Sequence, residues 1–119
     1  ASWIENQKID FIPRDLAELF GTAYAGSFGV DNPGVSPIYA DLRSLPPILV
    51  EVGECEVLRD QIVAFVKYAE AAGVPVQLMV APEMIHCFPM FSFATTRKKT
   101  PFLFESIDRI FDFIAGNCS

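Results

Sequence analysis

Basic side chains are scarce in this chain of 119 residues: nine Lys and Arg stand against fifteen Asp and Glu, a formal net charge of −6. Because nucleic acids and anionic membrane surfaces are bound through clustered Lys and Arg, this balance argues against both as partners. Long apolar runs are absent too, and residues 47–50 and 74–80 fall far short of the roughly 20 residues that span a bilayer. With 51% hydrophobic residues, we expect one soluble globular unit, residues 1–119, without a membrane span.

Cysteine and histidine are also rare, with three and one in the chain. Dispersed cysteines in an odd number, without Cys-X-X-Cys spacing, argue against a disulfide framework and a structural zinc site. The sequence also lacks a glycine-rich phosphate loop, so we expect no metal and no other cofactor. Residues 1–6 have neither the basic start nor the apolar core of a signal peptide. We therefore expect a reducing compartment, the cytoplasm.

Three helices and two strands are predicted from the apolar pattern. Apolar residues recur every three or four positions in the helices, and the strands are short, apolar and bounded by Pro or Gly. In chain order these are a helix over 14–20, a strand over 48–53, a helix over 58–72 capped by Gly73, a strand over 74–80, and a helix that Thr100 caps and Gly116 ends.

The order of strands and helices predicts the fold class. Strand, helix, strand, helix indicates parallel strands with right-handed crossover helices, an α/β sheet. The strand over 48–53 is apolar at almost every position, so we expect it to be buried on both faces. Because two strands expose about as much edge as they pair, we expect the sheet to continue elsewhere.

Polar residues that could form a site follow both predicted strands, and sites form at the carboxyl ends of parallel strands. Glu54, Glu56 and Asp60 follow the first strand, and His86 follows the second. Neighbouring strands lie about 4.8 Å apart, so a carboxylate could meet the imidazole, as in a nucleophile, base and acid triad. The residue types leave another interpretation open, because a lone histidine is often structural and the helix dipole favours acids at a helix start.

Several segments carry a more specific pattern. They are residues 36–50 (SPIYADLRSLPPILV), 52–53 (VG), 56–60 (EVLRD), 72–76 (AGVPV) and 84–86 (MIH), with looser matches at residues 2–6 and in the last helix. In these segments the chain resembles the carboxyl-terminal part of hormone-sensitive-lipase-like esterases, which are α/β-hydrolases. The resemblance implies that residues 1–119 are the later part of an α/β-hydrolase fold, in an enzyme that cleaves small carboxylic esters without a cofactor.

The resemblance also implies roles for two residues. His86, in the segment IHCF, stands where the family has its triad histidine. Matching residues 56–60 to the family's acid segment places Glu56 on the catalytic carboxylate, 30 positions before His86. Cys55 stands where some relatives have Asp, and Asp60 is then a structural acid near the helix start.

Two motifs of that family do not occur in the sequence: Gly-X-Ser-X-Gly, which carries the nucleophilic serine, and the His-Gly-Gly-Gly segment of the oxyanion hole. We expect the serine to lie upstream, in the amino-terminal part of the same hydrolase or in a second chain, and this chain alone to be inactive. His86 would then act as general base and acid, and Glu56 would orient it. The alternative is a truncated, non-catalytic relative that binds a ligand or a partner.

Two further groups of residues invite other interpretations. Cys87 is adjacent to His86, but neighbouring side chains on an extended loop point apart, so we do not expect a Cys-His nucleophile. The aromatic residues near the carboxyl end are expected in the core and at interfaces, and the resemblance implies a possible homodimer there: Phe88, Phe91, Phe93, Phe102, Phe104, Phe111 and Phe113.

Overall fold

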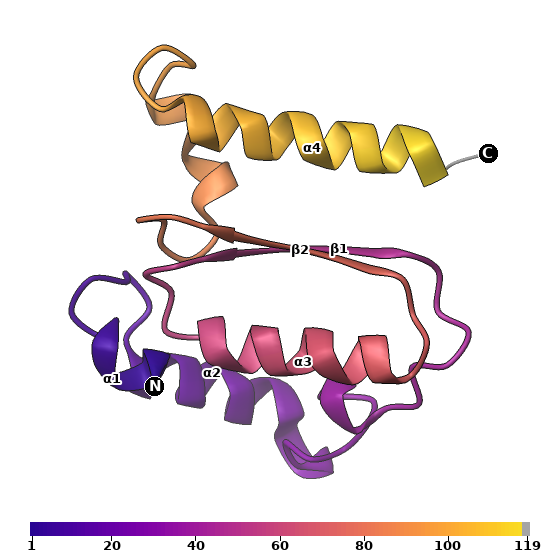
Figure 1. The fold of residues 1–119 in the computed structure, drawn as a ribbon. Coiled ribbons are helices and arrows are strands. Elements are labelled where there is room, and N and C mark those ends of the chain that lie inside the picture. Colours follow the sequence, from indigo (N-terminus) through magenta and orange to yellow (C-terminus); the bar gives the residue numbers. More distant parts are fainter. Residues whose placement is uncertain (118–119) are drawn as a thin grey trace.

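The computed structural model describes residues 1–117 as helices around a small sheet (Figure 1). In chain order the helices and strands are α1 (Ser2–Glu5), α2 (Arg14–Ala25), β1 (Ile48–Gly53), α3 (Arg59–Ala71), β2 (Val76–Ala81) and α4 (Pro101–Asn117). Three short 3-10 helices connect them: η1 (Gly26–Phe28), η2 (Pro37–Tyr39) and η3 (Phe88–Ala94).

The two strands pair in parallel and lie between two helices. Ile48 pairs with Val76 and Gly53 with Ala81, so both strands end at the same edge of the sheet. Figure 1 shows α3 on one face of the sheet, α4 on the other, and α1 and α2 outside α3. The carboxyl ends of both strands point toward the side where α1 lies. This arrangement confirms the predicted α/β class.

Helix boundaries differ from the sequence-based prediction at several places. α2 continues past residue 20 to Ala25 and ends where Gly26 adopts a φ of 53°. The predicted end of α4 at Gly116 is wrong, because α4 runs on to Asn117. A glycine inside a helix costs only about 1 kcal/mol relative to alanine, so backbone hydrogen bonding can carry the helix through it. α3 begins at Arg59, one residue later than predicted.

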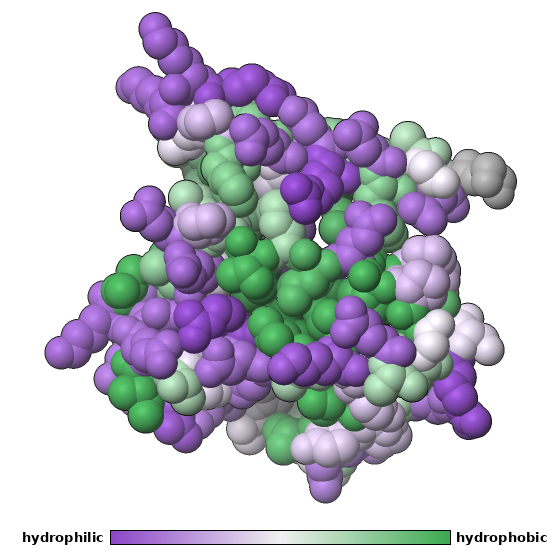
Figure 2. All heavy atoms as spheres, viewed as in Figure 1, coloured by the Kyte–Doolittle hydropathy of each residue, from purple (hydrophilic) through white to green (hydrophobic). Residues whose placement is uncertain are grey.

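The strands are less buried than their apolar sequences predict. In β1 only Val52 and Gly53 are buried, and residues 48–51 are half-buried, so the expectation of burial on both faces is wrong for most of this strand. In β2, Leu78 and Val80 are 37% and 41% exposed. The reason is that, among residues 1–117, each strand has one neighbour only, which leaves an edge of each open. Figure 2 shows apolar side chains gathered in the band between the helical layers.

Two small cores hold the helices against the sheet. The core on the α4 side consists of Met79, Ala81, Phe88 and Leu103. The core on the α3 side consists of Leu42, Ala69 and Val74. Some of the aromatic residues near the carboxyl end belong to the core on the α4 side: Phe88 is buried there, and Phe102 and Phe104 pack against it. Phe93 and Phe111 are exposed.

Gly53 ends β1 where the backbone of another segment passes very close. A Cβ atom at this position would overlap the carbonyl oxygen of Met84 and lie 2.7 Å from that of Ile85. The close approach also lets Cys55 N donate to Met84 O at 2.8 Å. Only glycine can stand here, because any side chain would push the loop after β2 away from the sheet.

We predict that Gly53→Ala destabilises the protein by about 1–3 kcal/mol, the range typical of overpacking a well-packed site. The matched control is Gly21→Ala on α2, where a Cβ meets nothing within 4 Å. That variant should gain about 0.5–1 kcal/mol, because alanine favours the helix over the unfolded chain. Urea unfolding measures both changes, and equal stabilities for the two variants would contradict the close approach at Gly53.

Candidate active site

Glu56 lies in the short turn that connects β1 to α3. The residue is only 3% exposed, and its carboxylate has two partners among the described residues. Gly53 N donates to Oε2 at 3.2 Å, which folds the side chain back toward the end of its own strand. The other carboxylate oxygen, Oε1, is left to accept a hydrogen bond from the loop after β2.

His86 lies in the loop after β2, and its ring meets the Glu56 carboxylate. Nδ1 lies 2.7 Å from Glu56 Oε1, a short hydrogen bond. The imidazole is about one quarter exposed, with 23% of its side-chain surface accessible. The Phe11 ring packs against it at a centroid distance of 5.8 Å. Within residues 1–117 the other ring nitrogen, Nε2, has no hydrogen-bond partner and can face a substrate or another group.

The other two acids that follow β1 do not reach the imidazole. Glu54 is exposed, and its Oε2 accepts from Glu83 N at 3.0 Å. Asp60 stands in the first turn of α3, where Oδ2 accepts from Ser2 N at 2.8 Å. This hydrogen bond and then the Arg59 guanidinium lower the pKa of Asp60. Of the three candidate carboxylates, Glu56 is therefore the one in contact with His86.

Two buried polar side chains of the amino-terminal segment hold the acid turn, a role that no local sequence pattern predicted for them. Ser2 Oγ donates to Val57 O at 2.7 Å. Asn6 Nδ2 donates to the carbonyl oxygens of both Glu54 and Glu56, at 3.0 and 2.9 Å. These bonds satisfy backbone acceptors that the irregular turn leaves without partners.

Asp10 is the third buried polar residue of this segment, and it touches both loops. Its carboxylate accepts from Val57 N at 2.8 Å and from His86 N at 3.2 Å. A signal for this group exists in the sequence, since Ser2, Asn6 and Asp10 are spaced four positions apart. Such spacing places residues on one face of successive helical turns, and their small polar side chains suit a polar contact.

An open groove lies beside the pair. It has a volume of about 1130 Å³, runs between α2, residues 30–39 and α3, and includes His86 in its lining. Apolar side chains such as Phe20, Ile38 and Phe65 line much of it. An apolar concave surface next to an acid and histidine pair can hold the apolar part of a small molecule.

Comparison with known proteins identifies the family of this chain. The sequence profile of the alpha/beta hydrolase fold family matches residues 1–90. The chain belongs to the alpha/beta hydrolase fold family. It is similar to an acetyl-hydrolase of Streptomyces hygroscopicus, with 42% identity over 74 residues, which are 60% of this chain and 25% of the relative. It is also similar to a triacylglycerol lipase of Mycobacterium tuberculosis, with 39% identity over 64 residues, 54% of this chain and 15% of the relative.

Solved structures of hydrolases match nearly all of this chain. A hormone-sensitive lipase from a metagenome library matches with a TM-score of 0.86 and 31% identity, over 98% of this chain and 39% of that one. An esterase from the bacterial hormone-sensitive lipase family matches with a TM-score of 0.84 and 31% identity, over 99% and 38%. The resemblance to hormone-sensitive-lipase-like esterases is confirmed. The chain spans well under half the length of each of these relatives.

Residues 1–117 contain no group of three or more His, Cys, Asp and Glu side chains that could hold a metal ion. In the same residues no helix is long and apolar enough to cross a membrane.

Cys87 follows His86 in a left-handed backbone conformation, with a φ of 50°. Desolvation of the sulfur, followed by the negative charges of Glu56 and Asp10, raises the pKa of its thiol. A raised pKa lowers the fraction of thiolate at neutral pH, and thiolate is the reactive form. Cys55 is a free thiol too, and Cys118 lies outside the described residues.

We predict that Cys87 in the folded protein reacts with iodoacetamide at pH 7.5 more slowly than in the protein unfolded in urea. The folded-state pKa is raised, so less thiolate is present at this pH and alkylation is slower. Peptide mapping by mass spectrometry measures the rate at this residue. Faster alkylation in the folded protein would contradict the electrostatic environment described for this thiol.

Proposed function

We propose that His86 and Glu56 are the base and acid of a Ser-His-Glu triad in a carboxylic-ester hydrolase. The observation that carries this proposal is the 2.7 Å contact between His86 Nδ1 and Glu56 Oε1 at the carboxyl edge of the sheet. In α/β-hydrolases the triad follows the chain order serine, acid, histidine, and Asp or Glu serves as the acid. Glu56 and His86 stand in that order.

The contact determines how the imidazole would act. When Nδ1 carries its proton and donates it to Glu56, Nε2 has a free lone pair that can accept the proton of a serine hydroxyl. The serine oxygen then attacks the ester carbonyl, and the carboxylate stabilises the resulting imidazolium. Nε2 next returns its proton to the oxygen of the departing alcohol, which leaves an acyl-serine. Water, activated by the same nitrogen, hydrolyses this intermediate.

The serine and the oxyanion donors would come from outside residues 1–119. In support, the sequence contains no Gly-X-Ser-X-Gly segment, while the solved hydrolases that match this chain are more than twice as long. The amino-terminal part of the same hydrolase or a second chain would supply these groups. On this proposal residues 1–119 alone do not hydrolyse esters.

A small carboxylic ester is the proposed substrate. The apolar groove beside His86 could accommodate its acyl or alcohol part. Two of the similar proteins, the triacylglycerol lipase and the esterase of the bacterial hormone-sensitive lipase family, have names that describe ester cleavage.

Hydrolysis of p-nitrophenyl acetate by the complete hydrolase, residues 1–119 together with the part that supplies the serine, tests these roles. We predict that His86→Ala lowers kcat by about 10⁴-fold or more, because no other group can accept the serine proton. Glu56→Gln should lower kcat by about 10³- to 10⁴-fold. The neutral amide can favour the wrong tautomer of His86, and it cannot stabilise the positive charge of the imidazolium that forms during the reaction. Glu56→Asp should retain more activity than Glu56→Gln, because it keeps the charge.

The matched control is Glu54→Gln, the same change two positions earlier in the same turn. Glu54 is exposed and does not contact His86, so we expect kcat within about twofold of the unchanged protein. Equal loss in Glu54→Gln and Glu56→Gln would contradict the assignment of the acid. Ester hydrolysis unaffected by His86→Ala, or absent from the unchanged complete hydrolase, would favour the non-catalytic binding relative instead.

A further inference from the structure

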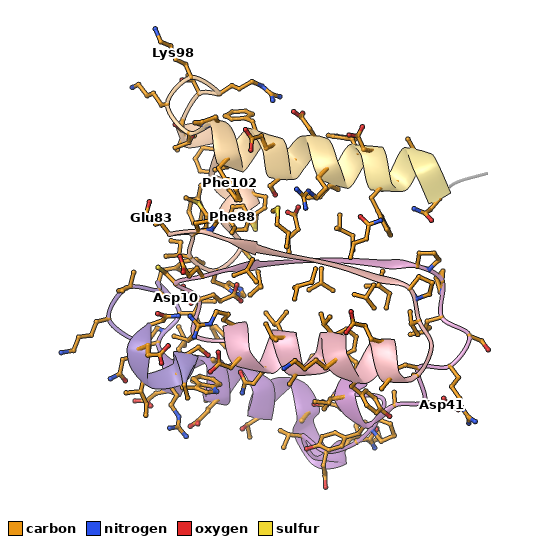
Figure 3. All side chains as sticks on the ribbon, in the orientation of Figure 1. Asp10, Asp41, Glu83, Phe88, Lys98 and Phe102 are labelled. Atoms are coloured by element: carbon orange, nitrogen blue, oxygen red, sulfur yellow. The ribbon has the colours of Figure 1, made fainter. Side chains whose placement is uncertain are left out.

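Asp10 joins the two loops that carry the proposed acid and base. The residue is 7% exposed, and Oδ2 accepts from Val57 N at 2.8 Å while Oδ1 accepts from His86 N at 3.2 Å. Val57 directly follows Glu56. One carboxylate thus contacts the backbone of the histidine itself and the backbone next to the acid. Figure 3 shows Asp10 beside the end of the sheet, with Glu83 at the same end and Asp41 at the opposite end.

The chemistry of the side chain suits this bridging position. Both neighbours are backbone N–H donors, and an ionised carboxylate offers two oxygens that only accept. An asparagine in the same place would turn an NH₂ group toward one of these donors, so it could keep one bond but not both. Hydrogen bonds to a charged acceptor are also roughly twice as strong as those between neutral groups.

Asp10 is itself held firmly against the acid turn. Its backbone N donates to Asn6 O at 2.9 Å, and the side chain of Asn6 donates to Glu54 O and Glu56 O. The next residue, Phe11, packs its ring against the imidazole of His86. Residues 6–11 therefore contact the backbone of both loops and the histidine ring.

We propose that Asp10 is a positioning residue, which holds the acid turn and the histidine loop at the separation that the Glu56 and His86 contact requires. This inference rests on the proposed esterase function. The sheet alone does not fix the distance between Glu56 and His86. The nearest backbone hydrogen bond between the two segments, from Cys55 N to Met84 O, precedes Glu56 in one segment and His86 in the other. A displacement of about 1 Å in a catalytic group can lower a rate by 10²-fold.

The first test measures ester hydrolysis by the complete hydrolase, with the part that supplies the serine, for Asp10→Ala and Asp10→Asn. We expect kcat to fall by about 10²-fold in Asp10→Ala, which removes both acceptors, and by about tenfold in Asp10→Asn, which keeps one. KM should stay within about twofold, because Asp10 is not among the residues that line the groove. Thermal unfolding of each variant reports whether it remains folded.

The matched control is Asp41→Asn. Asp41 Oδ1 also accepts a backbone N–H, from Arg43 at 3.1 Å, but it lies in an exposed turn at the far end of the sheet. We expect an unchanged kcat in this variant. Equal kcat values for Asp10→Ala and the unchanged protein would overturn the positioning role, as would a loss in Asp41→Asn as large as in Asp10→Asn.

The second test needs no catalysis. A short hydrogen bond at Nδ1 of His86 places its proton far downfield in the NMR spectrum, and His86→Ala identifies that signal by its loss. We expect the signal to be shifted or lost through exchange in Asp10→Ala and retained in Asp41→Asn. An unaltered signal in folded Asp10→Ala would overturn the inference, because the contact would then form without the bridge.

The two tests separate this inference from the function on which it rests. If His86→Ala leaves hydrolysis intact, the esterase proposal fails, and the NMR signal still decides whether Asp10 positions the pair. If His86→Ala abolishes hydrolysis and Asp10→Ala does not alter kcat, the positioning role alone fails.

Discussion

The parallel pairing of β1 with β2 is the constraint on which the rest of this structure depends. Because Gly53 pairs with Ala81, the two strands end together and the segments that follow them leave the sheet side by side. Glu56 and His86 are 30 residues apart in the chain, yet this register brings their side chains to 2.7 Å. Gly53 contributes the space, since its missing Cβ lets the backbone of the second segment approach the end of β1.

Polar side chains from the amino-terminal segment hold the two loops that leave the sheet. The turn after β1 is buried and irregular, so its backbone N–H and C=O groups need partners other than a ladder. Ser2 and Asn6 satisfy its acceptors, and Asp10 satisfies a donor of this turn and one of the histidine loop. The result is a buried acid in a turn that the amino-terminal segment holds by hydrogen bonds, next to a partly exposed imidazole. In such a low-dielectric setting their hydrogen bond is stronger than it would be in water.

The sequence predicted those features that depend on local pattern or on a family motif. The strand and helix order, the cap at Gly73 and the start of α4 at Pro101 follow from local periodicity and backbone preferences, and the resemblance pointed to Glu56 and His86. The roles of Ser2, Asn6 and Asp10 were not predicted, because each contacts groups about 50 or more residues away. Burial of β1 was overestimated, since residue type reveals apolar character but not which neighbours cover it.

The intact mass of the complete hydrolase, with the part that supplies the serine, after treatment with a fluorophosphonate is the most direct measurement of whether this acid and histidine pair activates a serine. Such reagents modify a serine that a neighbouring histidine has activated. We predict one adduct per molecule, which peptide mapping places on a serine outside residues 1–119 and which does not form in His86→Ala. An adduct on a serine within residues 1–119, or an adduct that forms at the same rate in His86→Ala, would contradict the proposed triad.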